Sequence, residues 1–218
     1  MGRVFALRNV RFFYRKKGSM KFISHLDMTR FMSRLIAKSK IPVWYTEGFN
    51  QHIYMNFAVP LSLGFEGLYE MVDVRLTDDS YSSDACLEAL KRVSPPDIEF
   101  ISVSDGEMAM KTIGFAKYEL EFEEFDFAEI LTEFLSRESI ICEKVGKKGK
   151  VKQIDLIPKI NSFEITDKGV NLILVAGSED NLNPSLIMTA FFEQCGIEPQ
   201  FYSVKRTMIY NREGKEFR

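Results

Sequence analysis

The segment Phe22–Leu35, FISHLDMTRFMSRL, decides how the first part of the chain folds. Ser24 followed three residues later by Asp27 matches the capping pattern that begins many helices. Apolar residues then recur at helical spacing and would line one side of a helix: Met28, Phe31, Met32, Leu35 and Ile36. Because a proline ends the pattern at Pro42, we predict a helix that begins after Ser24 and ends before Pro42.

Strands and a second helix surround this segment. Residues 4–14, VFALRNVRFFY, alternate between apolar and polar side chains, as a half-buried strand would. After the helix we expect short strands at 43–47 and 53–59, a long strand at 68–76, a helix at 84–93 and a strand at 98–103. The first half therefore has the order strand, helix, strands, helix, strand.

The second half repeats this order without repeating the residues. We expect a strand at 117–123, a helix from its cap at Asp126 to Leu135, a hairpin around the GKKG turn at 146–149, strands at 160–166 and 170–176, a helix capped by Asn183, and a strand at 201–210. This order is that of a ferredoxin-like domain. The sequence predicts an α+β protein with two tandem ferredoxin-like halves, residues 1–104 and 115–218, each with helices on one face of an antiparallel sheet.

Composition and cysteine usage indicate a folded protein of the cytoplasm. The chain has 218 residues, 45% of them hydrophobic and 28% charged, enough for one large core or two small ones. Its first residues contain no apolar run of signal-peptide length. Cys86, Cys142 and Cys195 lie far apart and form neither a CxxC metal pair nor a disulfide framework. We expect a cytoplasmic protein without a membrane span, and no motif indicates a cofactor.

The charge of the chain is unevenly distributed. Residues 1–60 hold 11 Lys and Arg residues against the two acids Asp27 and Glu47, a net charge of +9, whereas the whole chain carries −2. Such asymmetry indicates a face that binds polyanions, although a merely solvated basic surface would have the same composition.

Aromatic residues are interleaved with these basic residues, which is typical of proteins that hold single-stranded RNA. Arg30, Arg34 and Lys38 would form a stripe beside the apolar side of the predicted helix. The candidate RNA contacts are Arg11, Arg15, Lys16, Lys17, Lys21, Arg30, Arg34, Lys38, Trp44, Phe49 and Tyr54. The alternative is that the cations are a solvated surface and the rings belong to the core.

The two histidines of the chain are candidates for chemistry. If His25, Asp27 and His52 converged, two imidazoles and a carboxylate would suit a metal ion or acid–base catalysis. The structural alternative is that Asp27 caps a helix and that His25, at the edge of the apolar stripe, is partly buried and supports the fold. The spacing of the three residues favours this structural alternative.

Two motifs, SHLD at 24–27 and GFN at 48–50, belong to a longer pattern. The pattern consists of Phe22, Ser24, His25, Leu26, Asp27, Arg30, Gly48, Phe49, Asn50, His52, Pro60, Leu61 and Gly64, with Ile154, Asp155 and Pro158 later in the chain. It resembles the radical-SAM-associated domain of unknown function, a bacterial family fused to or encoded beside cobalamin-binding-type radical SAM proteins. Gln51 and Ile53 replace two prolines of that family, so this loop is less restrained.

The resemblance implies a partner rather than an enzyme. Radical SAM enzymes bind their cluster through a CxxxCxxC triplet, which this sequence lacks. We therefore expect a non-catalytic partner of a radical SAM protein that binds RNA or presents a substrate. Two alternatives remain open: an enzyme that acts on nucleic acid through His25, Asp27 and His52, and a module that binds only protein.

Overall fold

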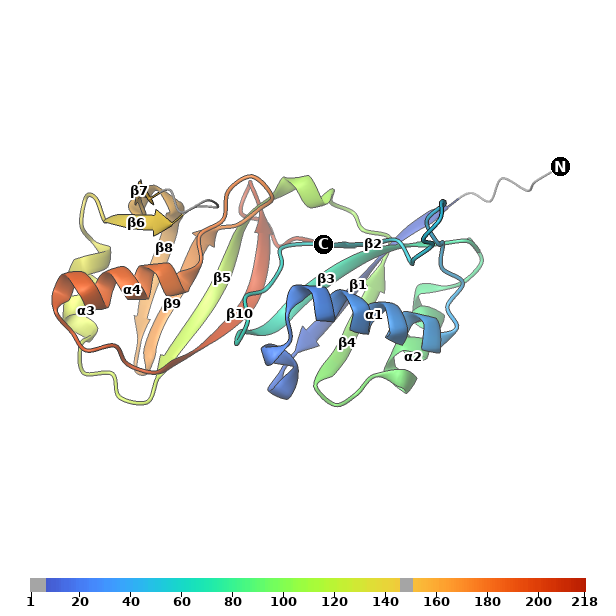
Figure 1. Ribbon diagram of the computed structural model, residues 1–218, viewed down its shortest axis with the longest axis horizontal. Helices are drawn as coiled ribbons and strands as arrows, with labels where there is room; N and C mark the ends of the chain where they lie inside the picture. Colours follow the sequence, from blue (N-terminus) through green and yellow to red (C-terminus); the bar gives the residue numbers. More distant parts are fainter. Residues whose placement is uncertain (1–6, 146–150) are drawn as a thin grey trace. The chain divides into compact units, whose positions relative to one another are not determined.

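The computed structural model describes residues 7–145 and 151–218, and its contacts divide the chain into two compact units. Unit 1 comprises Met1–Thr112 together with Phe217–Arg218, and unit 2 comprises Ile113–Glu216. The fold is α+β, as expected (Figure 1). The sequence pattern placed Phe217 and Arg218 at the end of the second half, whereas the structure includes them in unit 1.

Unit 1 consists of an antiparallel sheet and two α-helices. Its elements are β1 (Arg8–Lys16), the 3₁₀ helix η1 (Gly18–Phe22), α1 (His25–Ser39), β2 (Met55–Phe57), β3 (Glu66–Leu76), α2 (Ser83–Val93), β4 (Ile98–Ser104) and the 3₁₀ helix η2 (Met110–Thr112). The strand order is β4-β1-β3-β2. The first strand thus lies in the middle of the sheet, and the helix that follows it covers the strands.

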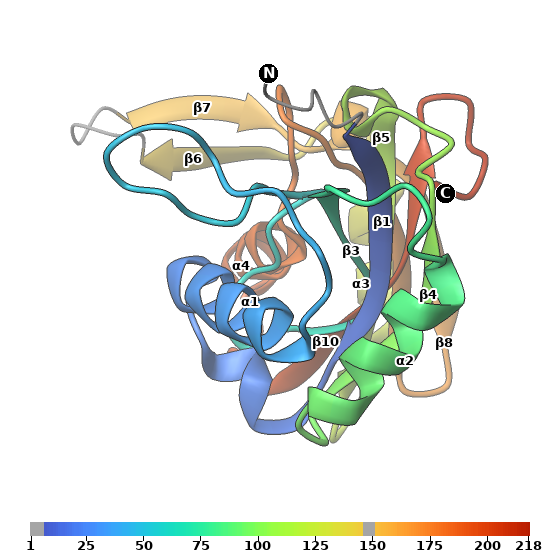
Figure 2. The same ribbon diagram turned by 90° about the vertical axis from the view of Figure 1, so that its right-hand side faces the viewer.

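The core of unit 1 lies between the sheet and both helices, which are next to each other in Figures 1 and 2. Val10, Phe12 and Tyr14 alternate along β1 and face this core. Side chains of successive strand residues point to opposite faces. Arg11 therefore points to the face of the sheet that carries no helix.

Unit 2 has a similar element order. Its elements are β5 (Ile113–Phe122), α3 (Ala128–Leu135), β6 (Ile141–Val145), β7 (Val151–Asp155), the 3₁₀ helix η3 (Ile157–Lys159), β8 (Ile160–Thr166), β9 (Gly169–Val175), α4 (Pro184–Cys195) and β10 (Tyr202–Asn211). The strand order is β10-β5-β9-β8, and β6 and β7 form a separate hairpin. Ring contacts among Phe122, Phe127, Phe134 and Phe191 hold α3 and α4 in its core.

Two details of the predicted elements are wrong. Residues 43–47 form no strand but only the isolated bridges Val43 to Leu76 and Tyr45 to Ile53. Helix α3 begins at Ala128 after Phe127, which makes no side-chain capping bond, so Asp126 is not its cap. Burial of Phe127 against Phe191 and Phe192, rather than a polar cap, fixes this helix start. The predicted GKKG turn lies outside the described residues.

The helix ends of α1 and α4 are confirmed. Ser24 is the N-cap of α1, and Asn183 caps α4, whose first residue is Pro184. Gly196 ends α4 with a φ of 65°, in the left-handed region that glycine adopts without strain. No helix within the described ranges is long and apolar enough to span a membrane.

Candidate nucleic-acid interface

Helix α1 is fixed at both ends by its own sequence. The Ser24 hydroxyl oxygen accepts a hydrogen bond of 3.1 Å from the main-chain N–H of Asp27, and its O–H donates to the Asp27 carboxylate at 2.7 Å. This reciprocal cap satisfies one of the N–H groups that a helix start leaves without partners. At the other end, Lys40 has a left-handed backbone and its N–H donates to the Ala37 carbonyl.

The two sides of α1 differ in chemistry. Its buried residues, Met28, Met32, Leu35, Ile36 and Ser39, face the core of unit 1. On the outer side, exposed residues recur at every fourth position: Leu26, Arg30, Arg34 and Lys38. Since residues four apart are neighbours on a helix surface, these four side chains form one continuous row, which we call the α1 ridge.

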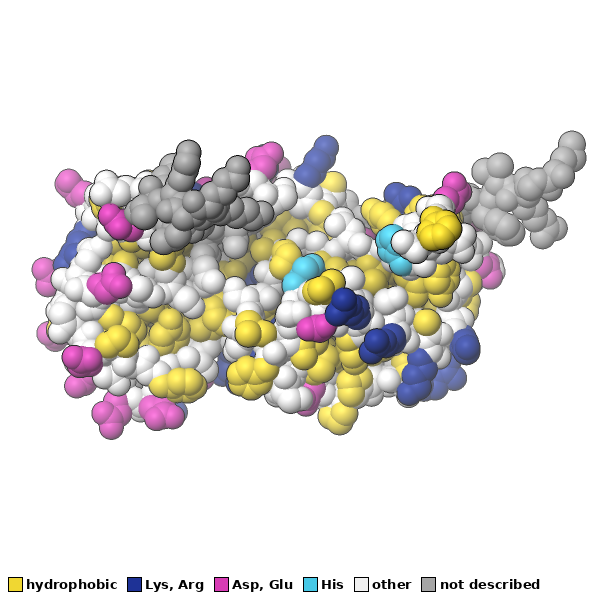
Figure 3. All heavy atoms as spheres, viewed as in Figure 1, with side chains coloured by type: hydrophobic (Ala, Val, Ile, Leu, Met, Phe, Trp, Pro, Cys, Tyr) yellow, Lys and Arg dark blue, Asp and Glu magenta, His cyan; other side chains and the backbone are white. Residues whose placement is uncertain are grey.

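Two cations of the α1 ridge have no acidic partner in the part of the chain that the structure describes. Arg30 pairs with Asp27 at 3.3 Å, but both side chains are more than half exposed, so water screens the pair. Arg34 and Lys38 form no ion pair with any residue of 7–145 and 151–218. Figure 3 shows Lys and Arg side chains in a dark-blue row over the region of α1 and α2. The ridge therefore presents uncompensated positive charge to solvent.

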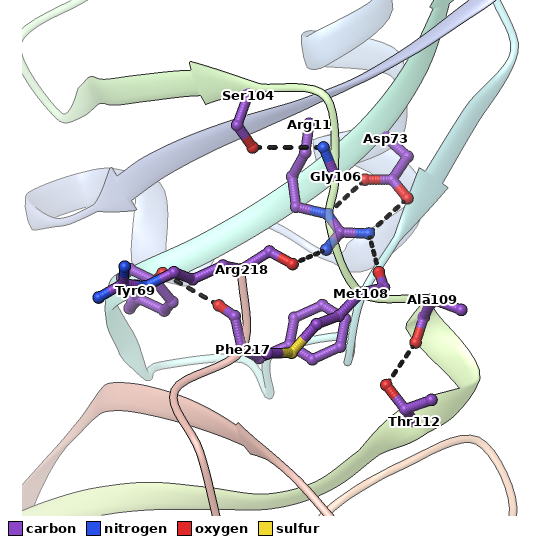
Figure 4. Close-up of polar contacts among 10 residues, drawn as sticks. All are labelled: Arg11, Tyr69, Asp73, Ser104, Gly106, Met108, Ala109, Thr112, Phe217 and Arg218. Atoms are coloured by element: carbon purple, nitrogen blue, oxygen red, sulfur yellow. Dashed lines mark hydrogen bonds and ion pairs between the residues drawn. The ribbon is translucent and has the colours of Figure 1, made fainter.

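Arg11 is a structural residue and is removed from the candidate RNA contacts. Its side chain is 2% exposed. The guanidinium donates two hydrogen bonds to the Asp73 carboxylate, at 2.7 and 2.9 Å, and one each to the main-chain oxygens of Met108 and Arg218 (Figure 4). It also lies over the ring of Phe217. Because Arg11 is buried and makes four hydrogen bonds inside unit 1, it has no access to a phosphate.

Arg15 near the end of β1, Lys17 just after it and Lys21 of η1 are also engaged. Arg15 and Lys17 both bind the Glu99 carboxylate, at 3.1 and 3.0 Å. The hydrogen bond from Lys17, followed by that from Arg15, lowers the pKa of Glu99 below its ordinary value. Lys21 pairs with Glu66 at 3.6 Å. Arg15, Lys17 and Lys21 remain partly exposed, but their charges are balanced locally.

Lys16 is buried and lines a small cavity of about 20 Å³ in unit 1, with Tyr14, His25 and Glu70 among the lining residues. That volume has room for about one water molecule. The structure therefore also removes Lys16 from the candidate RNA contacts. The signal was in the strand pattern, because Tyr14 and Lys16 are two residues apart in β1 and so share its core face. Glu70, which lines the same cavity, is not among the candidate residues that the sequence indicated.

The predicted aromatic contacts lie in two places. Trp44 and Tyr54 are half-buried, and their ring centroids lie 5.9 Å apart. The Arg75 guanidinium lies over both rings, 5.3 Å from the centroid of Trp44 and 4.3 Å from that of Tyr54. Arg75 alternates with the buried Val74 and Leu76 of β3, so this cluster lies away from the helix side of the sheet. The two rings thus do not extend the α1 ridge. Phe49 is fully exposed at the tip of its loop.

The two histidines make separate contacts. His25 is exposed, contrary to the expectation of partial burial, and its ring meets that of Phe57 edge to face at 5.2 Å. His52 Nδ1 lies 3.1 Å from both Thr46 Oγ1 and the Asn50 main-chain oxygen. Figure 3 shows the two cyan imidazoles apart on one face.

Asp27 is engaged with Ser24 and Arg30 and contacts neither imidazole in the described structure. Within residues 7–145 and 151–218, no three His, Cys, Asp or Glu side chains are grouped so that they could hold a metal ion. The described geometry therefore does not bring His25, Asp27 and His52 into one site.

Comparison with known protein families places the chain beside other bacterial sequences. The model of a family described as "Uncharacterized protein conserved in bacteria (DUF2344)" matches residues 9–184. This range covers β1 from its second residue and all of α1, and it reaches the first residue of α4. No curated protein matches the chain.

Proposed function

The chain belongs to the bacterial family DUF2344, and we propose that it binds RNA through the α1 ridge as a non-catalytic partner of a radical SAM protein. The observation that carries the RNA proposal is that Arg34 and Lys38 have no acidic partner among the described residues. Cations that have no ion pair to lose are free to replace the counterions of a phosphate backbone. Exposed arginine is also well suited to phosphate because its donors form a fork.

The geometry of the ridge fits a strand of phosphates. A helix rises 1.5 Å per residue, so successive ridge side chains are about 6 Å apart along the axis. This spacing is close to that of neighbouring phosphates in an extended single strand. Arg30, Arg34 and Lys38 are thus suited to three consecutive phosphates.

We also propose that both units have the ferredoxin-like fold. When the separate β6–β7 hairpin is left out, each strand order places the first strand of the unit between the third and the fourth, in β4-β1-β3-β2 and in β10-β5-β9-β8. Ferredoxin-like domains often bind RNA, although that support is an analogy of fold alone. In the present proposal the RNA lies on a helix rather than on the sheet.

The partnership with a radical SAM protein rests on the SHLD and GFN motifs. It predicts that a radical SAM protein copurifies with the tagged chain from native lysate, and that RNase treatment does not release it if the contact is between the proteins. Recovery of RNA without any radical SAM protein would leave the RNA-binding proposal in place and remove the partner.

The RNA proposal is tested by the salt dependence of binding. In the double variant Arg34→Ala/Lys38→Ala, we expect weaker binding and a log–log salt slope lower by about 1.4, since each phosphate contact on a single strand adds about 0.7. The charge-matched control is Arg15→Ala/Lys17→Ala, which removes two cations that are already paired with Glu99. An equal loss of slope in both variants would show that net charge, and not the ridge, determines binding.

A further inference from the structure

A patch of exposed apolar side chains lies at the N-terminal end of the α1 ridge. Phe22, Leu26 and Leu63 are 65%, 59% and 63% exposed. Phe22 ends η1, Leu26 lies in the first turn of α1, and Leu63 precedes β3. We call these three residues the apolar patch.

Hydrogen bonds and ion pairs fix the segments that carry the patch. The N–H of Gly64 donates to the main-chain oxygen of Lys21 at 2.8 Å, which holds the turn of Leu63 beside Phe22. Lys21 also pairs with Glu66, and its ammonium lies 5.4 Å from the centre of the Phe22 ring. The patch is therefore built on ordered backbone.

The segments next to the patch line one cavity. Ile23 and His25 on one side and Pro60 and Leu61 on the other are among the lining residues of the cavity of about 20 Å³ described above. The exposed imidazole of His25 adds a polar group beside the apolar side chains. The surface thus combines an aromatic ring, aliphatic side chains and a hydrogen-bonding group.

The patch is continuous with the cations of α1. Leu26 and Arg30 are four residues apart and hence neighbours on the helix surface, and Arg34 and Lys38 follow at the same spacing. In Figure 3 the dark-blue row begins beside exposed hydrophobic side chains and one of the two histidines. One helix surface therefore changes from apolar to cationic along its length.

We propose that the apolar patch receives an unstacked base of a single-stranded RNA whose following phosphates lie on Arg30, Arg34 and Lys38. This inference rests on the proposed function and specifies its ligand. Bases stack on exposed aromatic rings, and the adjoining row of cations complements a phosphate backbone rather than an apolar peptide. A base in an RNA duplex is paired and stacked, so a duplex cannot occupy the patch.

The test compares three fluorescein-labelled probes by anisotropy: a short oligouridine, a ribose-phosphate strand of the same length without bases, and a duplex of the same length. Oligouridine is chosen because its bases stack poorly on one another and are available. We expect the full-length protein to bind oligouridine more tightly than either other probe.

The variant Phe22→Ala distinguishes the contribution of base stacking to binding from that of the phosphate contacts. We expect it to weaken oligouridine binding about tenfold without changing the salt slope, because stacking releases no counterions. Binding of the base-free strand should be unchanged. Phe201→Ala is the matched control, since Phe201 is an exposed phenylalanine of unit 2, and it should bind like the wild type. Far-ultraviolet circular dichroism checks that both variants are folded.

Each other result has a distinct meaning. Equal losses on the oligouridine and the base-free strand, or no loss in Phe22→Ala, would overturn the base site. If Arg34→Ala/Lys38→Ala nevertheless lowers the salt slope, the proposed function survives that failure. A Phe22→Ala variant that keeps its RNA affinity but no longer retains a copurifying protein would assign the patch to a protein partner instead.

Discussion

The strand β1 and the helix α1 are both rich in basic residues, but they use their cations differently. In β1, Arg11 is buried against Asp73, and Arg15 shares Glu99 with the neighbouring Lys17. In α1, Arg34 and Lys38 have no acidic partner within the described residues. Both segments are rich in Lys and Arg. Only the positions of the acids around them distinguish cations that stabilise the fold from cations that are available to bind a ligand.

The difference follows from where each element lies. A strand in the middle of a sheet has neighbours on both sides, and β3 and β4 bring Asp73 and Glu99 to β1. The outer side of a helix that covers the sheet faces solvent instead of a neighbouring strand, and the acid that pairs with Arg30 of the ridge, Asp27, lies on α1 itself. The following predictions test this contrast, from the largest expected effect to the smallest.

The largest effect is expected from Arg11→Ala. The substitution leaves the Asp73 carboxylate without its guanidinium and removes the donors to the main-chain oxygens of Met108 and Arg218. Breaking a buried pair in this way costs about 3 kcal/mol of unfolding free energy, measured by urea denaturation. Arg34→Ala is the control on α1 and should cost less than about 0.5 kcal/mol. Similar costs in the two variants would contradict the contrast.

A smaller effect is expected from the caps of the two helices in unit 1. Ser24→Ala and Ser82→Ala each remove a hydroxyl that accepts a hydrogen bond of 3.1 Å at a helix start, and each should cost about 1 kcal/mol of unfolding free energy. Only Ser24→Ala should also weaken RNA binding, because the first turn of α1 carries Leu26 and precedes Arg30. Equal RNA affinities in the two variants would show that the ridge does not need an intact helix start.

A further variant adds an available cation to the ridge. Asp27→Asn removes the acid paired with Arg30 but keeps an oxygen to accept from Ser24. Because exposed pairs are worth little, RNA binding should tighten only about twofold, or about 0.5 kcal/mol. Glu88→Gln is a matched control, since Glu88 and Lys91 form the same kind of pair three residues apart on α2. An equal gain in the control would point to net charge alone.

The smallest effect concerns pH and the ion pairs that Arg15 and Lys17 form with Glu99. The pKa of Glu99 is lowered in the folded protein by Lys17 and Arg15, so its contribution to stability is present above its ordinary pKa and is lost as pH falls through the lowered value. We expect the difference in unfolding free energy between wild type and Glu99→Gln to shrink as pH falls from about 5 to about 3. The side chain is half exposed, so the difference is small at any pH. A difference that grows towards low pH would contradict this sign.

Local patterns could be predicted from the sequence, whereas long-range pairing could not. The start of α1 at Ser24, its core side and its exposed cations all follow from residues within one or two turns. The fate of Arg11 depends on Asp73, Met108 and Arg218, which are 62, 97 and 207 residues away. No pattern near Arg11 distinguishes it from Arg15, because residues four apart on a strand lie on the same face of the sheet.

The aromatic candidates show the same limit. Trp44 and Tyr54 were predicted as stacking platforms for bases, but the structure gives both of them the Arg75 guanidinium, which the sequence places more than 20 residues further along the chain. Phe22 and Leu26 were recognised as part of a motif, yet the exposure of Phe22 could not be predicted, because it lies in η1, before the helix whose apolar spacing indicates the core side.

The position of Phe217 and Arg218 in unit 1 has a consequence for how the protein is made. The strands of unit 1 leave the ribosome first, but the main-chain oxygens of Arg218 and Phe217 accept hydrogen bonds from the buried Arg11 of β1 and from Tyr69 of β3. All of unit 2 is translated between the main part of unit 1 and these last two residues. During synthesis the Arg11 network of unit 1 therefore stays incomplete until Phe217 and Arg218 have been added, after the whole of unit 2.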